Sequence, residues 1–237
     1  MQPVSLASAI LYRDSSLIVL NKPVGVKLHA GPAGGPALED GFGDLSFGTR
    51  QTPRAAHRLD HDTSGCLLLG RHDKAIKKLG RLFSAGRIEK VYWAIVLHCP
   101  KEQEGRIDAP LIKRNSPAGW HMAVDSAGQK AETLYRVLAS KAGLSWLEFR
   151  PRTGRTHQIR VHAAQLGCPL LGDTRYGGAQ GDHNIAAGDG GGLLLHARSL
   201  TIPYREAAPP IQVEAPLPPR FRDMLKRIAA PELLPNS

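Results

Sequence analysis

The nine residues His57–Gly65, His-Arg-Leu-Asp-His-Asp-Thr-Ser-Gly, are the part of this 237-residue chain best suited to chemistry. Arg58 places a cation beside the carboxylate of Asp60, and Asp62–Gly65 supplies side chains that bond their own backbone and favour a turn. Rigid loops at the ends of strands often carry catalytic groups. Taken alone, however, Asp60 also fits a helix cap or a salt bridge, so the residue types leave its role open.

A second concentration of polar residues lies at Arg152–His162, Arg-Thr-Gly-Arg-Thr-His-Gln-Ile-Arg-Val-His. The spacing predicts a helix over residues 156–166, capped by Thr156 and ended by Gly167. A basic helix start beside a glycine turn suits phosphate, although a solvated basic face has the same pattern. We expect no metal site, since His157 and His162 lie on different helix faces and no carboxylate completes a ligand set.

Tyr92 is the third residue of interest, within Lys90-Val-Tyr-Trp-Ala-Ile-Val-Leu97. The β-branched and aromatic content of this run predicts a strand, in which Tyr92 points opposite to Val91 and Trp93. A lone tyrosine in such a strand is more typical of a core than of a catalytic site.

Hydrophobic periodicity predicts the elements that position these residues. We expect a hairpin over residues 10–20, a helix over 73–84 with Asp73 as N-cap and Gly86 as stop, and a terminal helix over 221–229. Further strands are expected over residues 66–69, 91–97, 133–138, 144–149, 193–196 and 200–203. Residues 31–53 read as loop with one short helix, and residues 172–192 as a mobile loop. The pattern favours one mixed α/β domain.

Charge and composition narrow the partner. The formal net charge is +10 and the aromatic share is 5%. A basic excess favours a polyanionic partner, and nucleic acid is the first candidate. A soluble protein with a basic surface and no such partner would have the same net charge. The scarcity of aromatic residues argues against a stacking platform as the main binding device.

Cysteines and hydrophobic runs indicate the compartment. The three cysteines form no CxxC pair, so we expect reduced thiols and neither a zinc ribbon nor a disulfide framework. The N-terminus does not resemble a signal peptide, and no apolar run approaches the ~20 residues of a membrane span. We therefore expect a cytoplasmic monomer with no membrane association.

Together the motifs resemble the RluA type of pseudouridine synthase. The matching segments occur in one order over roughly residues 9–205. They are Leu20-Asn-Lys-Pro23 with Gly25, His57–Gly65, Lys90–Val96, Lys130-Ala-Glu-Thr-Leu-Tyr-Arg-Val137, Arg152–His162 continuing to Gly172-Asp173, and Leu195-His-Ala197. The motif His57–Gly65 is specific by itself. Because Thr153-Gly-Arg-Thr-His-Gln-Ile-Arg160 follows it in the expected order, the probability of a chance match is very small.

The resemblance implies a role for each candidate residue. Asp60 would be the essential carboxylate, Tyr92 the active-site tyrosine and Arg160 the arginine that pairs with Asp60. Arg58 would hold the target nucleotide out of the stack. We also expect RNA contacts from His57, Arg152, Arg155 and His157, and neither a cofactor nor a metal.

The resemblance also implies a fold and a substrate. The fold is α+β, with a mixed, largely antiparallel sheet flanked by helices, and the substrate is rRNA or tRNA. Only about nine residues precede the first motif. We therefore expect residues 1–237 to form a single catalytic domain without an N-terminal S4-type RNA-binding domain.

Two other function classes stay open at this point. A glycosidase would need a second carboxylate, for which Asp62 is the nearest candidate, and it would release free uracil. A non-catalytic RNA-binding protein would need only the charge, and it would leave uridine unchanged.

Overall fold

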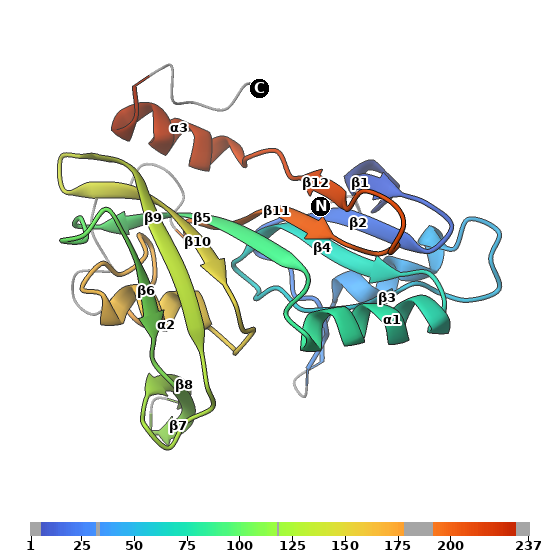
Figure 1. Ribbon diagram of the computed structural model, residues 1–237, viewed down its shortest axis with the longest axis horizontal. Coiled ribbons are helices and arrows are strands. Elements are labelled where there is room, and N and C mark those ends of the chain that lie inside the picture. Colours follow the sequence, from blue (N-terminus) through green and yellow to red (C-terminus); the bar gives the residue numbers. More distant parts are fainter. Residues whose placement is uncertain (1–5, 32–33, 118, 178–191, 231–237) are drawn as a thin grey trace. The chain divides into compact units, whose positions relative to one another are not determined.

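The computed structural model describes residues 6–31, 34–117, 119–177 and 192–230, and the chain forms two compact units. Unit 1 comprises residues 1–90 and 197–216, and unit 2 comprises residues 91–196 and 217–237. Each unit has strands, helices and a buried hydrophobic cluster of its own (Figure 1). The loop expected to be mobile falls mainly on residues 178–191, which lie outside the described residues.

Unit 1 is built around the strand order β1-β2-β4-β11, with β3 paired to β4 and β12 paired to β11. The pairings β1–β2, β2–β4, β3–β4 and β11–β12 are antiparallel. Its strands are β1 (Ile10–Arg13), β2 (Leu17–Lys22), β3 (Arg54–Ala55), β4 (Ser64–Gly70), β11 (Leu195–Ile202, from residue 197 on) and β12 (Ile211–Glu214). Its helices are η1 (Leu6–Ala9), η2 (Leu38–Leu45) and α1 (Asp73–Ser84).

The core of unit 1 explains why these segments fold as they do. All seven residues of β4 are buried, as are Leu17–Leu20 of β2. The buried residues of α1, namely Ala75, Leu79 and Leu82, recur at helical spacing and belong to the same cluster as the strands. The hairpin over residues 10–20, the buried strand over 66–69 and the short helix in 31–53 are thereby confirmed.

Helix α1 has the predicted bounds, but its cap was predicted wrongly. His72 is the N-cap, because its ring Nδ1 accepts a hydrogen bond of 3.1 Å from the amide of Ala75. Asp73 is the first helical residue, where its carboxylate still favours the positive end of the helix dipole. Gly86 has a φ of 65° just beyond the helix, which confirms it as the stop.

Unit 2 has the strand order β5-β10-β9-β6 and a separate two-stranded sheet, β7-β8. The pairings β5–β10, β9–β10, β6–β9 and β7–β8 are antiparallel. Its strands are β5 (Glu89–Leu97, from residue 91 on), β6 (Glu104–Asp108), β7 (Leu111–Ser116), β8 (Gly119–Val124), β9 (Glu132–Lys141) and β10 (Leu144–Pro151). Its helices are α2 (Gln158–Gln165) and α3 (Pro219–Ile228).

Two boundaries differ from the sequence prediction. Helix α2 begins at Gln158 rather than Thr156, because its N-cap His157 adopts a left-handed conformation with a φ of 53°. The predicted strands over 193–196 and 200–203 are one continuous strand, β11. Arg198 interrupts its apolar pattern, but the guanidinium pairs with Glu214 of β12 at 2.6 Å, so the strand tolerates the charge.

The two helices of unit 2 occupy opposite faces of its sheet. Phe221, Met224, Leu225 and Ile228 of α3 pack in one cluster with Ile95 and Trp146. On the other face, Gln158 and His162 of α2 bond the hydroxyl of Thr133 in β9 at 2.9 and 2.8 Å. Arg160 belongs to α2, so this candidate residue of unit 2 lies on the face that α2 covers.

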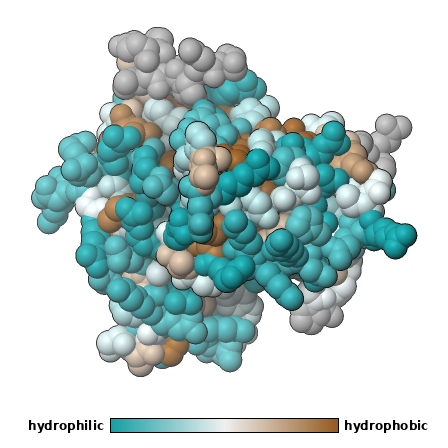
Figure 2. All heavy atoms as spheres, turned by 45° about the vertical axis from the view of Figure 1, so that its right-hand side comes forward, coloured by the Kyte–Doolittle hydropathy of each residue, from teal (hydrophilic) through white to brown (hydrophobic). Residues whose placement is uncertain are grey.

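The surface is mostly hydrophilic on the face shown in Figure 2, where brown spheres occur as small separate groups. Within the described parts of the chain, no helix is both long and apolar enough to cross a membrane.

Candidate active site

Asp60 lies on a tight turn of unit 1 just before β4. The amide of Thr63 donates to the backbone carbonyl of Asp60 at 3.1 Å, which closes the turn. Thr63 is buried, Asp60 is half-buried and Arg58 is exposed. The turn therefore holds the half-buried Asp60 on a backbone that is anchored at the buried Thr63.

Lys22 provides that fixation, and the sequence did not single it out. Its side chain is 0% exposed, and its Nζ donates to the carbonyls of Pro23, His61 and Thr63 at 2.8, 3.1 and 2.9 Å. Burial lowers the Lys22 pKa from 10.5 to about 8, while attraction to the carboxylates of Asp62 and Asp60 opposes this. An ammonium thus supports the motif turn from within.

Two glycines let backbones meet around the same turn. The amide of Gly25, with a φ of 75°, donates to the carbonyl of His61 at 3.0 Å. Gly65 pairs with Lys22 in the sheet and has a φ of 105°. A Cβ at Gly65 would lie 2.2 Å from the carbonyl oxygen of Ala197, so only glycine fits there. These contacts give a physical reason for both glycines of the matched motifs.

His57 attaches the start of the motif to β4. Its Nε2 accepts from the amide of Leu68 at 3.0 Å, and its ring lies 5.0 Å from that of Phe83. Burial, and then the charge of Lys90, lowers the His57 pKa to about 4, against a hydrogen bond to the Arg58 backbone. The ring is therefore neutral at pH 7. This geometry favours a positioning role, and RNA contact by His57 stays a prediction.

In unit 2, Arg160 on α2 is held in a fixed orientation. Its Nε and Nη2 donate to the two carboxylate oxygens of Asp173, both at 2.7 Å. The Arg160 side chain is 9% exposed and that of Asp173 is 0% exposed. Asp173 also accepts from the amides of Arg175 and Tyr176 at 3.0 Å. Asp173 belonged to a matched motif, but its role as the partner of Arg160 was not predicted.

Tyr92 lies on β5 of unit 2, is 9% exposed, and pairs with Phe149 of β10. Side chains alternate along a strand, so Tyr92 points opposite to Trp93 and Ile95. Ile95 faces α3, and Tyr92 therefore faces the side that α2 covers. The structure thus brings Tyr92 and the helix of Arg160 to one face of the sheet in unit 2.

The other predicted RNA-binding residues of unit 2 surround the start of α2. Arg152 and Arg155 are exposed, and Arg155 Nε donates to the carbonyl of Lys130 at 3.0 Å. The ring of His157 lies 2.7 Å from the Tyr176 hydroxyl and stacks on Trp120 at 5.2 Å. RNA contact by these residues stays a prediction.

Comparison with known proteins decides the family. A family described as RNA pseudouridylate synthase matches residues 16–165. An uncharacterized RNA pseudouridine synthase of Zymomonas mobilis is 44% identical over 221 residues, or 92% of this chain and 98% of that protein. The chain belongs to the RNA pseudouridine synthase family. It is thus an enzyme of the class that converts uridine in RNA to pseudouridine, which sets aside the glycosidase and the non-catalytic alternatives.

Other members of the family support the subtype and the fold. The ribosomal large subunit pseudouridine synthase C of Yersinia pestis is 33% identical over 232 residues, which cover 93% of this chain and 69% of that protein. The structure named human RNA pseudouridylate synthase domain containing 4 is similar with a TM-score of 0.80 and 28% identity, over 95% of each chain. The RluA-type resemblance and the α+β pseudouridine synthase fold are confirmed.

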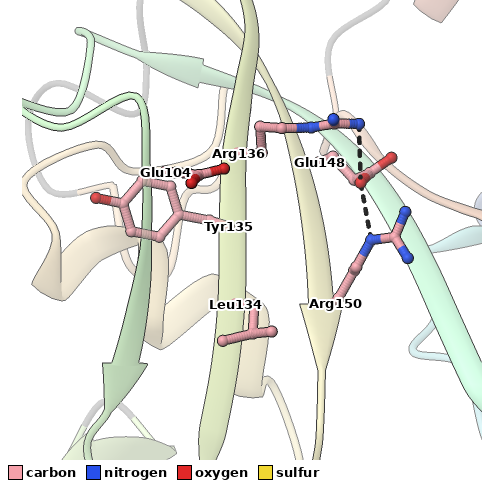
Figure 3. A pocket seen from close by; sticks show the side chains of 6 residues that line it. All are labelled: Glu104, Leu134, Tyr135, Arg136, Glu148 and Arg150. Atoms are coloured by element: carbon pink, nitrogen blue, oxygen red, sulfur yellow. Dashed lines mark hydrogen bonds and ion pairs between the residues drawn. The ribbon is translucent and has the colours of Figure 1, made fainter.

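A cavity of about 240 Å³ lies beside strands β6, β9 and β10 of unit 2 (Figure 3). It is lined by Glu104, Leu134, Tyr135, Arg136, Glu148 and Arg150. None of the predicted site residues lines it. Its cations are already paired, because Arg136 and Arg150 both donate to Glu148, at 3.4 and 2.9 Å. We do not assign this cavity to the pseudouridine synthase reaction.

No group of three or more histidine, cysteine or acidic side chains is placed to hold a metal ion in the part of the chain that the structure describes.

Proposed function

We propose that Asp60 is the essential carboxylate of this pseudouridine synthase, that Tyr92 and Arg160 act with it, and that no cofactor takes part. The observation that carries the proposal is the mounting of Asp60. Its turn is held by a fully buried lysine that bonds three backbone carbonyls, and by a neutral histidine attached to β4. A carboxylate on so rigid a turn is preorganised for a reaction centre.

The reaction breaks the C1′–N1 glycosidic bond of a uridine and forms a C1′–C5 bond to the same uracil. An ionised Asp60 suits this either as a nucleophile or by stabilising positive charge that develops on the sugar. Tyr92, on the face that α2 covers, would stack on the base and accept or donate a proton. Its buried position would help to exclude water, which would otherwise capture the sugar.

Arg160 is proposed to orient Asp60 and to favour its charged form. The support is its own rigidity, since Asp173 holds two of its nitrogens in a bidentate pair. A fork fixed in this way loses little conformational freedom when it meets a second carboxylate. Both units would thus contribute to one catalytic domain over residues 1–237.

Arg58 is proposed to occupy the space that the target nucleotide leaves when it swings out of its stack. Such extrusion costs a few kcal/mol, which stacking and phosphate contact by an arginine would partly offset. Its exposure beside Asp60 supports this role. Arg152, Arg155 and His157 would contact the flanking RNA.

The substrate is proposed to be rRNA or tRNA, and the protein a cytoplasmic monomer. The Yersinia pestis relative is named for the large ribosomal subunit, and a Xenopus tropicalis relative, 31% identical, is named as a mitochondrial pseudouridylate synthase. Mapping pseudouridines in RNA from cells with and without the gene would identify the substrate. Unchanged maps in both rRNA and tRNA would contradict the proposed substrate class.

The test of the proposal is the variant Asp60→Asn, which keeps the shape of the side chain and removes its charge. We expect it to lose tritium release from RNA that contains 5-³H-uridine while it still binds that RNA. Asp62→Asn is the matched control, because Asp62 lies two residues away with a 47% exposed side chain beside His61. Full activity of Asp60→Asn would show that the essential group is elsewhere.

A further inference from the structure

The β7-β8 hairpin of unit 2 carries a cluster of cations around one tryptophan. Lys113 Nζ lies 5.0 Å, and Arg175 Cζ 5.1 Å, from the centre of the Trp120 ring. Arg175 Nη1 also donates to the Trp120 carbonyl at 2.9 Å. Trp120 is 38% exposed, and both cations are exposed. Lys113, Trp120 and Arg175 are called the hairpin cluster below.

The cations of the hairpin cluster have different kinds of partners from the arginines around them. Neighbouring arginines have acidic partners, as in the pairs Arg114–Asp125 and Arg106–Glu132. Over residues 6–31, 34–117, 119–177 and 192–230, neither Lys113 nor Arg175 forms an ion pair with a carboxylate. Two positive groups held within about 5 Å of one ring repel each other, and an anion between or beside them would relieve that repulsion.

The ring of Trp120 already contacts other side chains. It stacks on His157 with an interplanar angle of 22°, in addition to its contacts with the two cations. Trp120 therefore organises charge, and a nucleobase would have to compete with His157 and the two cations for its ring. A phosphate suits this arrangement better than a base, because the cationic groups are the exposed ends of the cluster.

We propose that the hairpin cluster binds the phosphate backbone of the substrate RNA, away from the target uridine. The proposal rests on the proposed function, which supplies the RNA. Charge complementarity favours this occupant, because the cations are exposed and paired with aromatic and carbonyl groups instead of carboxylates. Lys113 and Arg175 would then add to affinity without reading sequence.

The hairpin cluster is also connected to the arginine proposed to act in catalysis. The Tyr176 hydroxyl accepts from the amide of Met122 in β8 at 3.1 Å and lies 2.7 Å from His157 Nδ1. The Tyr176 ring lies 5.0 Å from the guanidinium of Arg160. RNA bound at the hairpin would therefore contact an element that Tyr176 links by hydrogen bonds to His157 at the start of α2.

The experiment measures binding of a fluorescein-labelled, unmodified tRNA transcript as salt is varied, in a set of proteins that all carry Asp60→Asn to prevent turnover. Each phosphate contact contributes about 0.7 to 0.9 to the slope of log affinity against log salt. We expect Lys113→Gln and Arg175→Gln each to lower the slope by about that amount and to weaken binding about three- to tenfold. Lys113→Arg should restore both. Lys141→Gln, an exposed lysine at the end of β9, is the control and should change neither.

Outcomes of the binding assay and of tritium release separate this proposal from the proposed function. Unchanged slopes in both glutamine variants, or absence of RNA binding by the parent protein, would overturn the role of the hairpin cluster. An equal loss of slope in Lys141→Gln would do the same, because it would show a diffuse charge effect. With Asp60 intact, Lys113→Gln should raise KM for RNA with little change in kcat. The activity of Asp60→Asn tests the proposed function separately. If that variant stayed active, the role of Asp60 would be wrong, but the salt slopes would still test RNA binding by the hairpin cluster.

Discussion

At the scale of single residues, the most informative side chain is Lys22, which is buried while charged. Two of its three acceptor carbonyls, those of His61 and Thr63, belong to the turn around Asp60, and the third is that of Pro23, the next residue in the chain. Sequence alone placed Lys22 in the matched segment Leu20–Pro23 without a role, since burial of a charged group depends on partners far along the chain. His57 is a second example. The sequence did not indicate that its ring accepts a hydrogen bond from β4, and its predicted contact with RNA stays a prediction.

Replacement of this lysine by an apolar residue should loosen the turn. In Lys22→Met the three carbonyls lose a charged donor, and each buried acceptor left unpaired costs about 1–3 kcal/mol. We expect a loss of about 2–4 kcal/mol in the free energy of unfolding, measured by urea denaturation, together with a lower kcat. Stability equal to the parent protein would show that the contacts made by Lys22 are not needed to hold the turn.

The same lysine should give stability a pH dependence of known sign. Its pKa in the folded protein is about 8, below its ordinary value of 10.5, so the unfolded chain binds more protons between these values. The proton-linked part of its contribution is therefore complete above about pH 10.5 and is lost as pH falls through about 8, whereas its three hydrogen bonds persist below that pH. We expect the stability of the parent protein minus that of Lys22→Met to rise from pH 8 to pH 10. A constant or falling difference in urea titrations would contradict this.

At the scale of elements, the close approach of β4 and β11 should tolerate no side chain at Gly65. A Cβ there would overlap the Ala197 carbonyl, and the positive φ adds strain. We expect Gly65→Ala to destabilise the protein by about 2–4 kcal/mol in thermal or urea unfolding. Gly80→Ala is the control. Gly80 lies in α1 with nothing within 4 Å of its Cβ position, and alanine there should stabilise by about 0.5–1 kcal/mol.

The segment after α2 should matter because it orients Arg160. In Asp173→Asn the amide offers one acceptor oxygen in place of two, so the bidentate pair is lost. We expect a fall in kcat of about tenfold or more with a smaller change in KM, since the effect passes through a group proposed to act on Asp60. Asp125→Asn is the control, because Asp125 pairs with exposed Arg114. Equal losses in both variants would point to general destabilisation.

Elements also differ in how far the sequence predicts them. The bounds of α1 were predicted because three buried residues recur at helical spacing between a polar start and a glycine stop. The start of α2 was predicted two residues too early, since His157 adopts a left-handed conformation that non-glycine residues rarely take. A ring held between Trp120 and Tyr176 fixes that conformation. Such side-chain contacts between distant segments cannot be recognised from the sequence around the helix start.

At the scale of the whole molecule, thiol reactivity should follow burial. Cys66 and Cys168 are buried, with pKa values raised to about 12 and about 11, first by burial, whereas Cys99 is exposed. Only thiolates react quickly with alkylating agents. We expect iodoacetamide to label one cysteine in the native protein and three after denaturation, as counted by intact mass. Rapid native labelling at two or three sites would contradict the buried environments.

The order of motifs along the chain predicted the family and the reaction class for the whole molecule, and the net charge agreed with an RNA substrate. The sequence did not predict the partners that orient the candidate residues. Asp173 and Tyr176 stood in a segment without recognisable periodicity. Their roles depend on contacts with α2 and β8 that only the folded chain creates.

The hydrogen bond from the Met122 amide to the Tyr176 hydroxyl has a further consequence for the surface of the protein. Met122 pairs with Lys113 across the hairpin, and its amide points away from β7, along the outer edge of β8. Exposed strand edges invite pairing with strands of other molecules. The hydroxyl of Tyr176 occupies an edge position of β8 where such a strand would add, so the cations of the hairpin cluster stand beside an edge that is closed to another strand at Met122.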